Sequence, residues 1–136
     1  MPVDARGPFD LTLTPVHLGL GASISPQENF TGDLEWYERY AERTKDDGAD
    51  GRLVQIFDFA ESWTSWEMHP HGEELVVCVS GSFTLIQERD GQMHSIDLAS
   101  GEAAINPVGV WHTADARGPA SALFVTSGLG TEHRPR

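Results

Sequence analysis

Residues 66–74, with the sequence WEMHPHGEE, place two histidines and three glutamates within nine positions. The five side chains are Glu67, His69, His71, Glu73 and Glu74. Imidazole nitrogens and carboxylate oxygens are ligands that proteins use for divalent ions such as Mn, Fe, Zn or Ni. The segment therefore predicts a metal site, and the spacing of the five side chains indicates which of them take part.

The alternation of a β-strand sorts these side chains by face. Glu67 and His69 point to the same side of an extended segment, because successive side chains alternate. Pro70 has no backbone N–H to donate, so the strand ends there. A new strand begins at Glu73 or Glu74, and Glu73 has the parity of a solvated residue. An antiparallel pairing brings Glu74 beside the face that carries Glu67 and His69.

A second segment, GEAAINPVGVWHTADA, covers residues 101–116. The spacing of its glycines, proline and histidine resembles the second motif of the cupin superfamily, G-x5-P-x-G-x2-H-x3-N. The matching positions are Gly101, Pro107, Gly109 and His112, all at the family's spacing, and Ala116 stands where the family has asparagine. The resemblance covers roughly residues 52–127. It implies an all-β fold, a small cupin-type β-barrel (double-stranded β-helix or jelly roll) with an N-terminal arm and one short helix outside it.

The first cupin motif, G-x5-H-x-H-x3-4-E-x6-G, is matched at Glu74 and Gly81. If His71 were its second histidine, only two residues would separate that histidine from Glu74, whereas His69 leaves four. His69 therefore takes the second position, and Glu67 stands in place of the first histidine. His71 falls in the turn, where it is a candidate acid or base.

The resemblance thus implies a divalent metal (Mn, Fe, Zn or Ni) held by four residues. They are Glu67, His69, Glu74 and His112. Two alternatives stay open. In the first, His71 completes the site in place of Glu67. In the second, the pocket holds no metal, and the same groups act as acid, base or hydrogen-bond partners.

The elements that must position these residues are short strands. Eight segments with strand-like patterns follow residue 52, and Asp90-Gly91 supplies a tight hairpin turn between two of them. We divide the chain into an arm (1–32), a helix (33–48), the barrel (49–130) and a polar tail (131–136) that either frays or closes over a neighbour. The helix begins at Asp33, and its predicted face carries Leu34, Tyr37, Ala41 and Thr44.

The composition of the chain limits the kinds of partner that we expect it to bind. The chain has 136 residues, the size of one domain, and a formal charge of −12, which disfavours nucleic acid and anionic membranes. The single cysteine, Cys78, lies in an apolar run and fits a buried residue of a cytoplasmic protein. No signal peptide or membrane-spanning stretch is visible. Among small cupins an arm of this kind implies a homodimer.

The sequence supports three functional hypotheses. The first is a metal-dependent enzyme acting on a small apolar or aromatic molecule, with dioxygenase-, isomerase- or cyclase-like chemistry. The second is a small-molecule binding or sensing module with a weak or absent metal site. The third is a metal-free isomerase. The remaining histidines, His17, His94 and His133, are expected to be exposed, and Trp63, Trp66 and Trp111 to pack in the core and rim.

Overall fold

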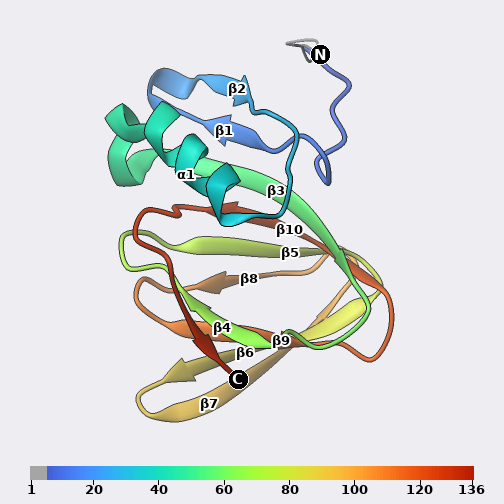
Figure 1. Ribbon diagram of the computed structural model, residues 1–136. Coiled ribbons are helices and arrows are strands. Elements are labelled where there is room, and N and C mark those ends of the chain that lie inside the picture. The colour runs from blue at the N-terminus through green and yellow to red at the C-terminus, as the bar shows by residue number, and fades with distance from the viewer. Residues whose placement is uncertain (1–5) are drawn as a thin grey trace.

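The structure is a computed structural model that describes residues 6–136, so the first five residues of the predicted arm lie outside it. Two antiparallel sheets face each other (Figure 1). The six-stranded sheet runs β2 (Ile24–Pro26), β1 (Val16–Leu18), β3 (Arg52–Phe59), β10 (Ala120–Thr126), β5 (Glu74–Ser80) and β8 (Ala103–Asn106). The five-stranded sheet runs β11 (Glu132–Pro135), β4 (Ser65–Met68), β9 (Trp111–Asp115), β6 (Ser82–Arg89) and β7 (Gln92–Ala99).

The strand pattern predicted from the sequence is confirmed. Each of the eight predicted segments contains a strand, and the predicted bounds of β3 and β6 agree with the observed ones. Asp90 and Gly91 both have positive φ, 54° and 73°, as a tight turn between paired antiparallel strands requires. Three strands were not among the eight, namely β1, β2 and β11.

The interior of the barrel has an apolar part and a polar part. Apolar side chains fill most of it, among them Val76, Cys78, Phe83, Leu85, Ala114 and Phe124. Cys78 is fully buried, as its apolar neighbours in the sequence predicted. Glu74 lies on the same face of β5 as Val76 and Cys78, yet it is surrounded by buried polar groups. One strand therefore carries both an apolar core and the start of a polar cluster.

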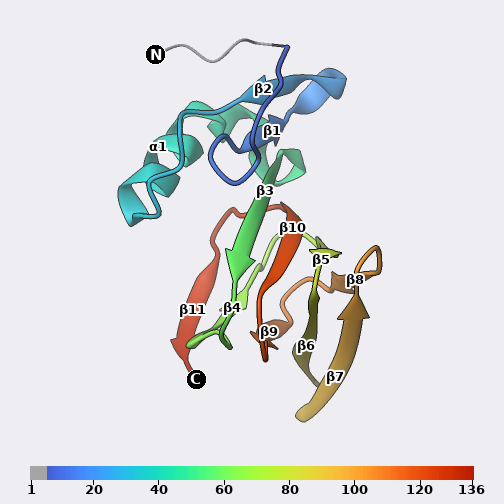
Figure 2. The same cartoon turned by 90° about the vertical axis from the view of Figure 1, so that its right-hand side faces the viewer.

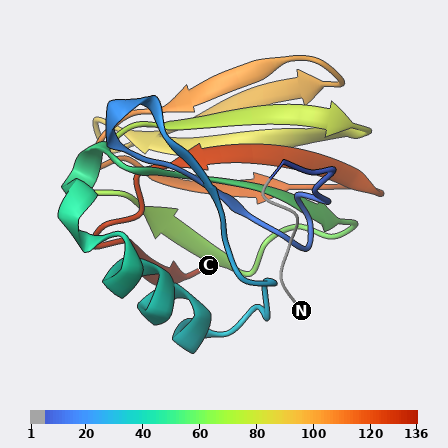
Figure 3. The ribbon, with the colours of Figure 1, turned by 90° about the horizontal axis from the view of Figure 1, so that it is seen from above.

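The N-terminal arm extends the larger sheet. β1 pairs with β2 on one side and with β3 on the other, and Figures 1 and 2 show β1, β2 and α1 at one end of the molecule with β7 at the other. Figure 3 shows α1 outside both sheets. No helix in the described part of the chain is long and apolar enough to span a membrane.

The helix α1 spans Leu34–Arg43, and Asp33 caps it by accepting a 2.8 Å hydrogen bond from the Trp36 backbone N–H. A 3-10 segment, Lys45–Asp50, follows. The predicted buried face is wrong, because Leu34 is 72% exposed whereas Trp36 is fully buried. Trp36 stacks on Tyr40, one turn later, with ring centres 5.7 Å apart, so the buried face is the one that carries these two rings.

The C-terminal tail does not fray within this chain, because β11 pairs with β4. The Arg134 guanidinium lies over two tryptophan rings, 5.0 Å from the centre of Trp66 and 4.6 Å from that of Trp111. Trp66 is buried, as predicted, and Trp111 is half-buried. The two rings and Arg134 thus hold the last strand against the barrel.

Candidate metal centre

Three strands of the two sheets supply the predicted site residues. Glu67 lies in β4 and His69 directly after its end, Glu74 opens β5, and His112 lies in β9. Glu67 is directly opposite His112 in the pairing of β4 with β9. β5 belongs to the other sheet, so the closed barrel brings Glu74 to the residues of β4 and β9.

The ring nitrogens of two histidines converge on one carboxylate. His69 Nε2 lies 3.1 Å from Glu74 Oε2, and His112 Nε2 lies 3.2 Å from Glu74 Oε1. The three residues are 5%, 1% and 4% exposed for His69, His112 and Glu74, so water hardly reaches them. Ligand atoms of Glu67, His69 and His112 all lie within 4.8 Å of one another. A single ion placed among these atoms is within reach of all three residues.

Neighbouring polar groups fix the Glu74 carboxylate. The Asn106 side-chain amide donates to Oε1 at 2.9 Å, and the Thr126 hydroxyl donates to Oε2 at 2.6 Å. Gln87 in turn donates to the Asn106 side-chain oxygen at 2.8 Å. Sequence reasoning missed these three residues. Gln87 carried a signal, because it shares the inward face of β6 with Phe83 and Leu85 and is a polar side chain in an apolar row.

Each histidine uses its other ring nitrogen elsewhere. His69 Nδ1 lies 2.8 Å from the Thr131 hydroxyl, and His112 Nδ1 lies 3.5 Å from the Val110 carbonyl oxygen. Both Nε2 atoms are buried and, among the residues that the structure describes, lack a partner with hydrogen-bond geometry, although Glu74 is close to each. Unpaired imidazole nitrogens beside an oriented carboxylate are a donor set that binds divalent cations in proteins. The residues therefore fit a metal ion.

The ionisation of the cluster follows from its contacts. Burial by itself would raise the pKa of Glu74, but the close contacts with His112 and His69 outweigh burial and hold that pKa well below the ordinary value. Burial by itself would lower the pKa of His112, yet the neighbouring Glu74 carboxylate raises it above the ordinary value. Glu74 is therefore ionised at neutral pH, and its negative charge attracts positive charge, whether protons or a metal ion.

Comparisons with known proteins identify the architecture. No protein-family model and no curated protein matches the sequence. Solved structures match: an oxalate oxidase in complex with glycolate has a TM-score of 0.53 at 18% identity, over 60% of this chain and 45% of that one. Together with the two-sheet barrel and its buried histidine–glutamate cluster, this match decides the fold. The chain has a cupin fold.

Two further solved structures match with lower TM-scores. A cupin-2 domain protein from Shewanella frigidimarina has a TM-score of 0.47 at 20% identity, over 62% of this chain and 71% of that one. A hydroquinone 1,2-dioxygenase from Sphingomonas with 4-hydroxybenzoate bound also has a TM-score of 0.47, at 18% identity, over 54% of this chain and 57% of that one. The matched region thus spans about half the length of the dioxygenase and the oxidase.

Glu67 and His71 occupy different positions relative to the buried histidine–glutamate cluster. Glu67 is half-buried with its side chain 26% exposed, and it lies among the cluster and 3.9 Å from His133 Nε2. His71 is exposed in the turn before β5. The geometry brings Glu67 to the two buried histidines, and His71 is not part of that group.

A row of aromatic rings in contact runs from the site toward α1. The Trp63 ring centre lies 6.4 Å from that of His112 and 5.8 Å from that of Phe124. Phe57 follows at 5.7 Å from Phe124, and Phe30 bridges Phe57 to Tyr37 of α1, each at 5.6 Å. The Trp63 ring therefore lies at the site as well as in the packed interior.

A polar pair accompanies the aromatic rings. The Tyr37 hydroxyl donates weakly to the Gln55 side-chain oxygen at 3.4 Å, and Gln55 is a buried, inward-facing residue of β3. Burial, followed by the charge of Glu67, raises the pKa of Tyr37 to about 12. Tyr37 therefore keeps its proton at neutral pH, and Tyr37 and Gln55 place polar groups beside the row of aromatic rings.

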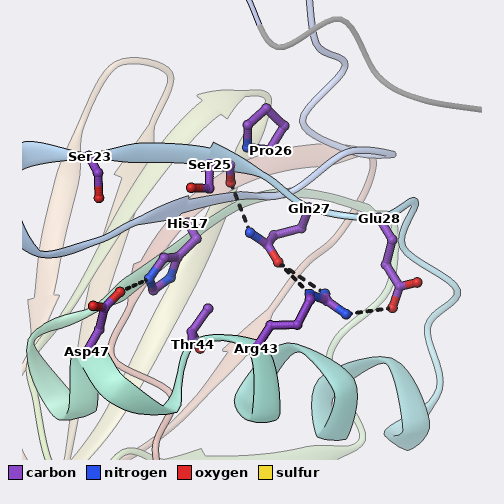
Figure 4. Close-up of a pocket in the computed structure, with 9 residues that line it drawn as sticks. All are labelled: His17, Ser23, Ser25, Pro26, Gln27, Glu28, Arg43, Thr44 and Asp47. Atoms are coloured by element: carbon purple, nitrogen blue, oxygen red, sulfur yellow. Dashed lines mark hydrogen bonds and ion pairs between the residues drawn. The ribbon is translucent and has the colours of Figure 1, made fainter.

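His17 contradicts the expectation of an exposed histidine, because it is 5% exposed. Its Nε2 lies 2.6 Å from Asp47 Oδ2, and its Nδ1 lies 2.6 Å from the Tyr40 hydroxyl. This network borders a surface pocket of about 550 Å³ between the arm and the helix, where Arg43 bonds to Gln27 and Glu28 (Figure 4). His94 is half-buried and His133 exposed.

Proposed function

We propose that this cupin binds one divalent metal ion through Glu67, His69, Glu74 and His112 and acts on a small ring-bearing molecule inside the barrel. The observation that carries the proposal is the pair of buried Nε2 atoms, at 3.1 and 3.2 Å from one carboxylate, without hydrogen-bond partners. Leaving two buried nitrogens unsatisfied costs about 1–3 kcal/mol each. An ion bound by both nitrogens removes that cost.

The ligand set indicates the class of ion. Two carboxylates neutralise the charge of a divalent cation, and two imidazoles with two carboxylates favour Mn or Fe(II) over copper. When bound, such an ion supplies Lewis acidity or oxygen activation at the coordination positions that the protein leaves free. Asn106 and Thr126 keep Glu74 oriented toward it through their hydrogen bonds.

The proposed substrate class rests on the aromatic and polar side chains near the site. Trp63, Phe57 and Phe124 form an aromatic cluster that begins 6.4 Å from the His112 ring, and such a cluster suits a planar ring. Gln55 and the protonated Tyr37 hydroxyl offer hydrogen bonds to an oxygen substituent on such a ring. We propose a dioxygenase-, isomerase- or cyclase-type reaction on an oxygen-bearing, uncharged ring compound. The negative charge of the two glutamates disfavours an anionic substrate that does not itself bind the metal.

A second candidate is a binding or sensing cupin without metal. It is favoured by the partners of Glu74, because both of its oxygens already accept hydrogen bonds from Asn106 and Thr126 and lie beside histidines. If those histidines carry protons, the cluster is electrically satisfied without an ion. In that case the barrel binds its ligand through the aromatic rings alone.

Elemental analysis separates the two candidates. Protein purified without chelator is expected to contain close to one equivalent of a divalent metal, and His69→Ala protein to contain almost none. Ligand binding to wild-type protein that lacks metal under all conditions would establish the binding module instead. Turnover that requires re-addition of the metal to chelator-treated protein would establish the enzyme.

A further inference from the structure

We propose that Thr131, in the C-terminal segment, is a positioning residue of the metal centre that sets which nitrogen of His69 is free to bind the ion. The proposal rests on the proposed metal-binding function. Thr131 lies 62 positions from His69 in the sequence, directly before β11, and no sequence motif connects the two. Their contact is a 2.8 Å hydrogen bond between the threonine Oγ1 and His69 Nδ1.

The direction of this hydrogen bond follows from proton accounting. The Thr131 hydroxyl has one proton, and it donates that proton to the Gly128 carbonyl oxygen at 2.9 Å. Its oxygen can then only accept from His69, so the proton of the neutral imidazole must be on Nδ1. A neutral imidazole protonated at Nδ1 carries its lone pair on Nε2. Nε2 is the atom that lies in the cluster with Glu74, where a metal ligand is needed.

The rest of the segment holds Thr131 in place. Gly130 precedes it at a φ of 73°, and a side-chain carbon added there would meet Pro70 at 3.2 Å, so this turn packs on the residue that follows His69. After Thr131, Glu132 pairs with Met68 of β4. Arg134 is held between Trp66 and Trp111. The docked strand therefore delivers the hydroxyl to the ring.

The two histidines of the site differ in this respect. His112 Nδ1 faces the Val110 carbonyl oxygen, two residues away in the same segment, so its orientation is local. His69 depends on a segment that reaches the site only because β11 docks on β4. Binding free energies are reciprocal, so a metal ion that requires the docked segment also stabilises its docking.

The test compares Thr131→Val, which removes the acceptor, with Thr131→Ser, which keeps it. Nitrogen-15 NMR of histidine-labelled, metal-free protein reports the tautomer of His69. Competition with a chromophoric chelator reports the affinity for Zn²⁺. We expect Thr131→Val to move the His69 proton partly to Nε2 and to weaken Zn²⁺ binding by about 10- to 100-fold, the range of lost outer-shell partners. Thr131→Ser is expected to keep both properties of the wild type.

Two controls make the result specific. Thr84→Val removes a threonine whose hydroxyl donates to Asp97 on the surface, and it is expected to leave the His69 tautomer and the Zn²⁺ affinity unchanged. Thr131→Ala gives a second acceptor-free variant in case the valine is poorly accommodated. The proposal is overturned if Thr131→Val and Thr131→Ala keep the wild-type tautomer, or if Thr131→Ser loses affinity as severely as Thr131→Val. If wild-type protein binds no Zn²⁺, the proposed function fails, and the tautomer of metal-free protein still decides the role of Thr131.

Discussion

Two histidine-centred networks are buried in this molecule, and they differ in one nitrogen atom. At His17 both ring nitrogens are bonded, to Asp47 and Tyr40, each at 2.6 Å. At His69 and His112 only Nδ1 has a partner, and Nε2 lies buried beside Glu74 without hydrogen-bond geometry. The first network lies outside the barrel between arm and helix, and the second lies inside it.

The difference separates a structural histidine from a ligand. A ring with both nitrogens bonded has no lone pair left for a metal or a substrate, so His17 serves to attach the arm to the helix region. Gly19 and Gly51 let the ring pack closely, since an added carbon at Gly51 would meet His17 Cε1 at 2.6 Å. The pocket beside His17 has volume but no unsatisfied group facing it from this histidine, whereas the barrel site has two.

The largest expected effect comes from replacing one histidine of each network by alanine and comparing the two affinities for a divalent ion. His112→Ala is expected to lower the affinity for a divalent ion by more than roughly 1,000-fold, about 4 kcal/mol, because a ligand is lost together with one of the two histidines beside Glu74. Isothermal titration with Zn²⁺ measures it. His17→Ala is expected to bind the ion as wild type does.

The same His17→Ala variant is expected to lose stability instead. Removing the ring leaves the Tyr40 hydroxyl and the Asp47 carboxylate without their hydrogen-bond partner, at a cost of about 2–3 kcal/mol in the free energy of unfolding. Urea denaturation measures this cost. Loss of metal binding in His17→Ala protein that remains folded would contradict the distinction between the two networks.

Glu74→Gln tests the charge at the centre of the site with little change in shape. The amide cannot neutralise the ion, so the affinity for Zn²⁺ is expected to fall about 100-fold, or about 3 kcal/mol. Asp47→Asn makes the matching change at the His17 network and is expected to leave the affinity unchanged. An affinity for Zn²⁺ that is unaffected in Glu74→Gln would remove Glu74 from the ligand set.

The pH dependence should differ with and without metal. The pKa of His112 is raised above its ordinary value of 6.5, and metal binding must displace that proton, so affinity is expected to rise up to tenfold per pH unit below the raised pKa. Titrations with Zn²⁺ at several pH values check this slope. Binding that is independent of pH would show that His112 is not a ligand.

In metal-free protein, the stability that His112 contributes falls as pH rises, whereas its affinity for a metal ion rises with pH. Its raised pKa contributes stability below 6.5 that is lost as pH rises through the folded-state pKa. The lowered pKa of Glu74 contributes stability above 4.5 that is lost as pH falls toward the folded-state value. These two groups should therefore both raise the melting temperature of chelator-treated protein between pH 4.5 and pH 6.5.

The smallest effects come from the residues at the rim. His71→Ala is expected to change metal affinity and stability by less than about 0.5 kcal/mol, because the side chain is exposed. Glu67→Ala, in comparison, is expected to lower affinity about tenfold, close to 1.4 kcal/mol. Zn²⁺ titration of both variants decides the matter. The reverse outcome would restore the pairing of His69 with His71.

Local pattern was enough to predict the barrel. Alternation of apolar side chains, a proline after β4 and the Asp90-Gly91 turn act between near neighbours, so the strands from β3 to β10 could be found without tertiary information. The helix cap at Asp33 is equally local. The buried face of the helix was not, since Leu34 and Trp36 each begin a series at helical spacing and only the surface that the helix meets selects between them.

Strand parity in the sequence placed Glu67 and His69 on one face, and the resemblance to the cupin motifs added His112; the structure brings ligand atoms of these three residues within 4.8 Å of one another. Only the folded chain shows which histidine nitrogens are bonded, because hydrogen bonds to Thr131, Asp47 and Tyr40 join residues distant in sequence. An unbonded Nε2 and a fully bonded ring look the same in a sequence. They differ only in which atoms the folded chain brings within 3 Å of them, roughly the length of a hydrogen bond.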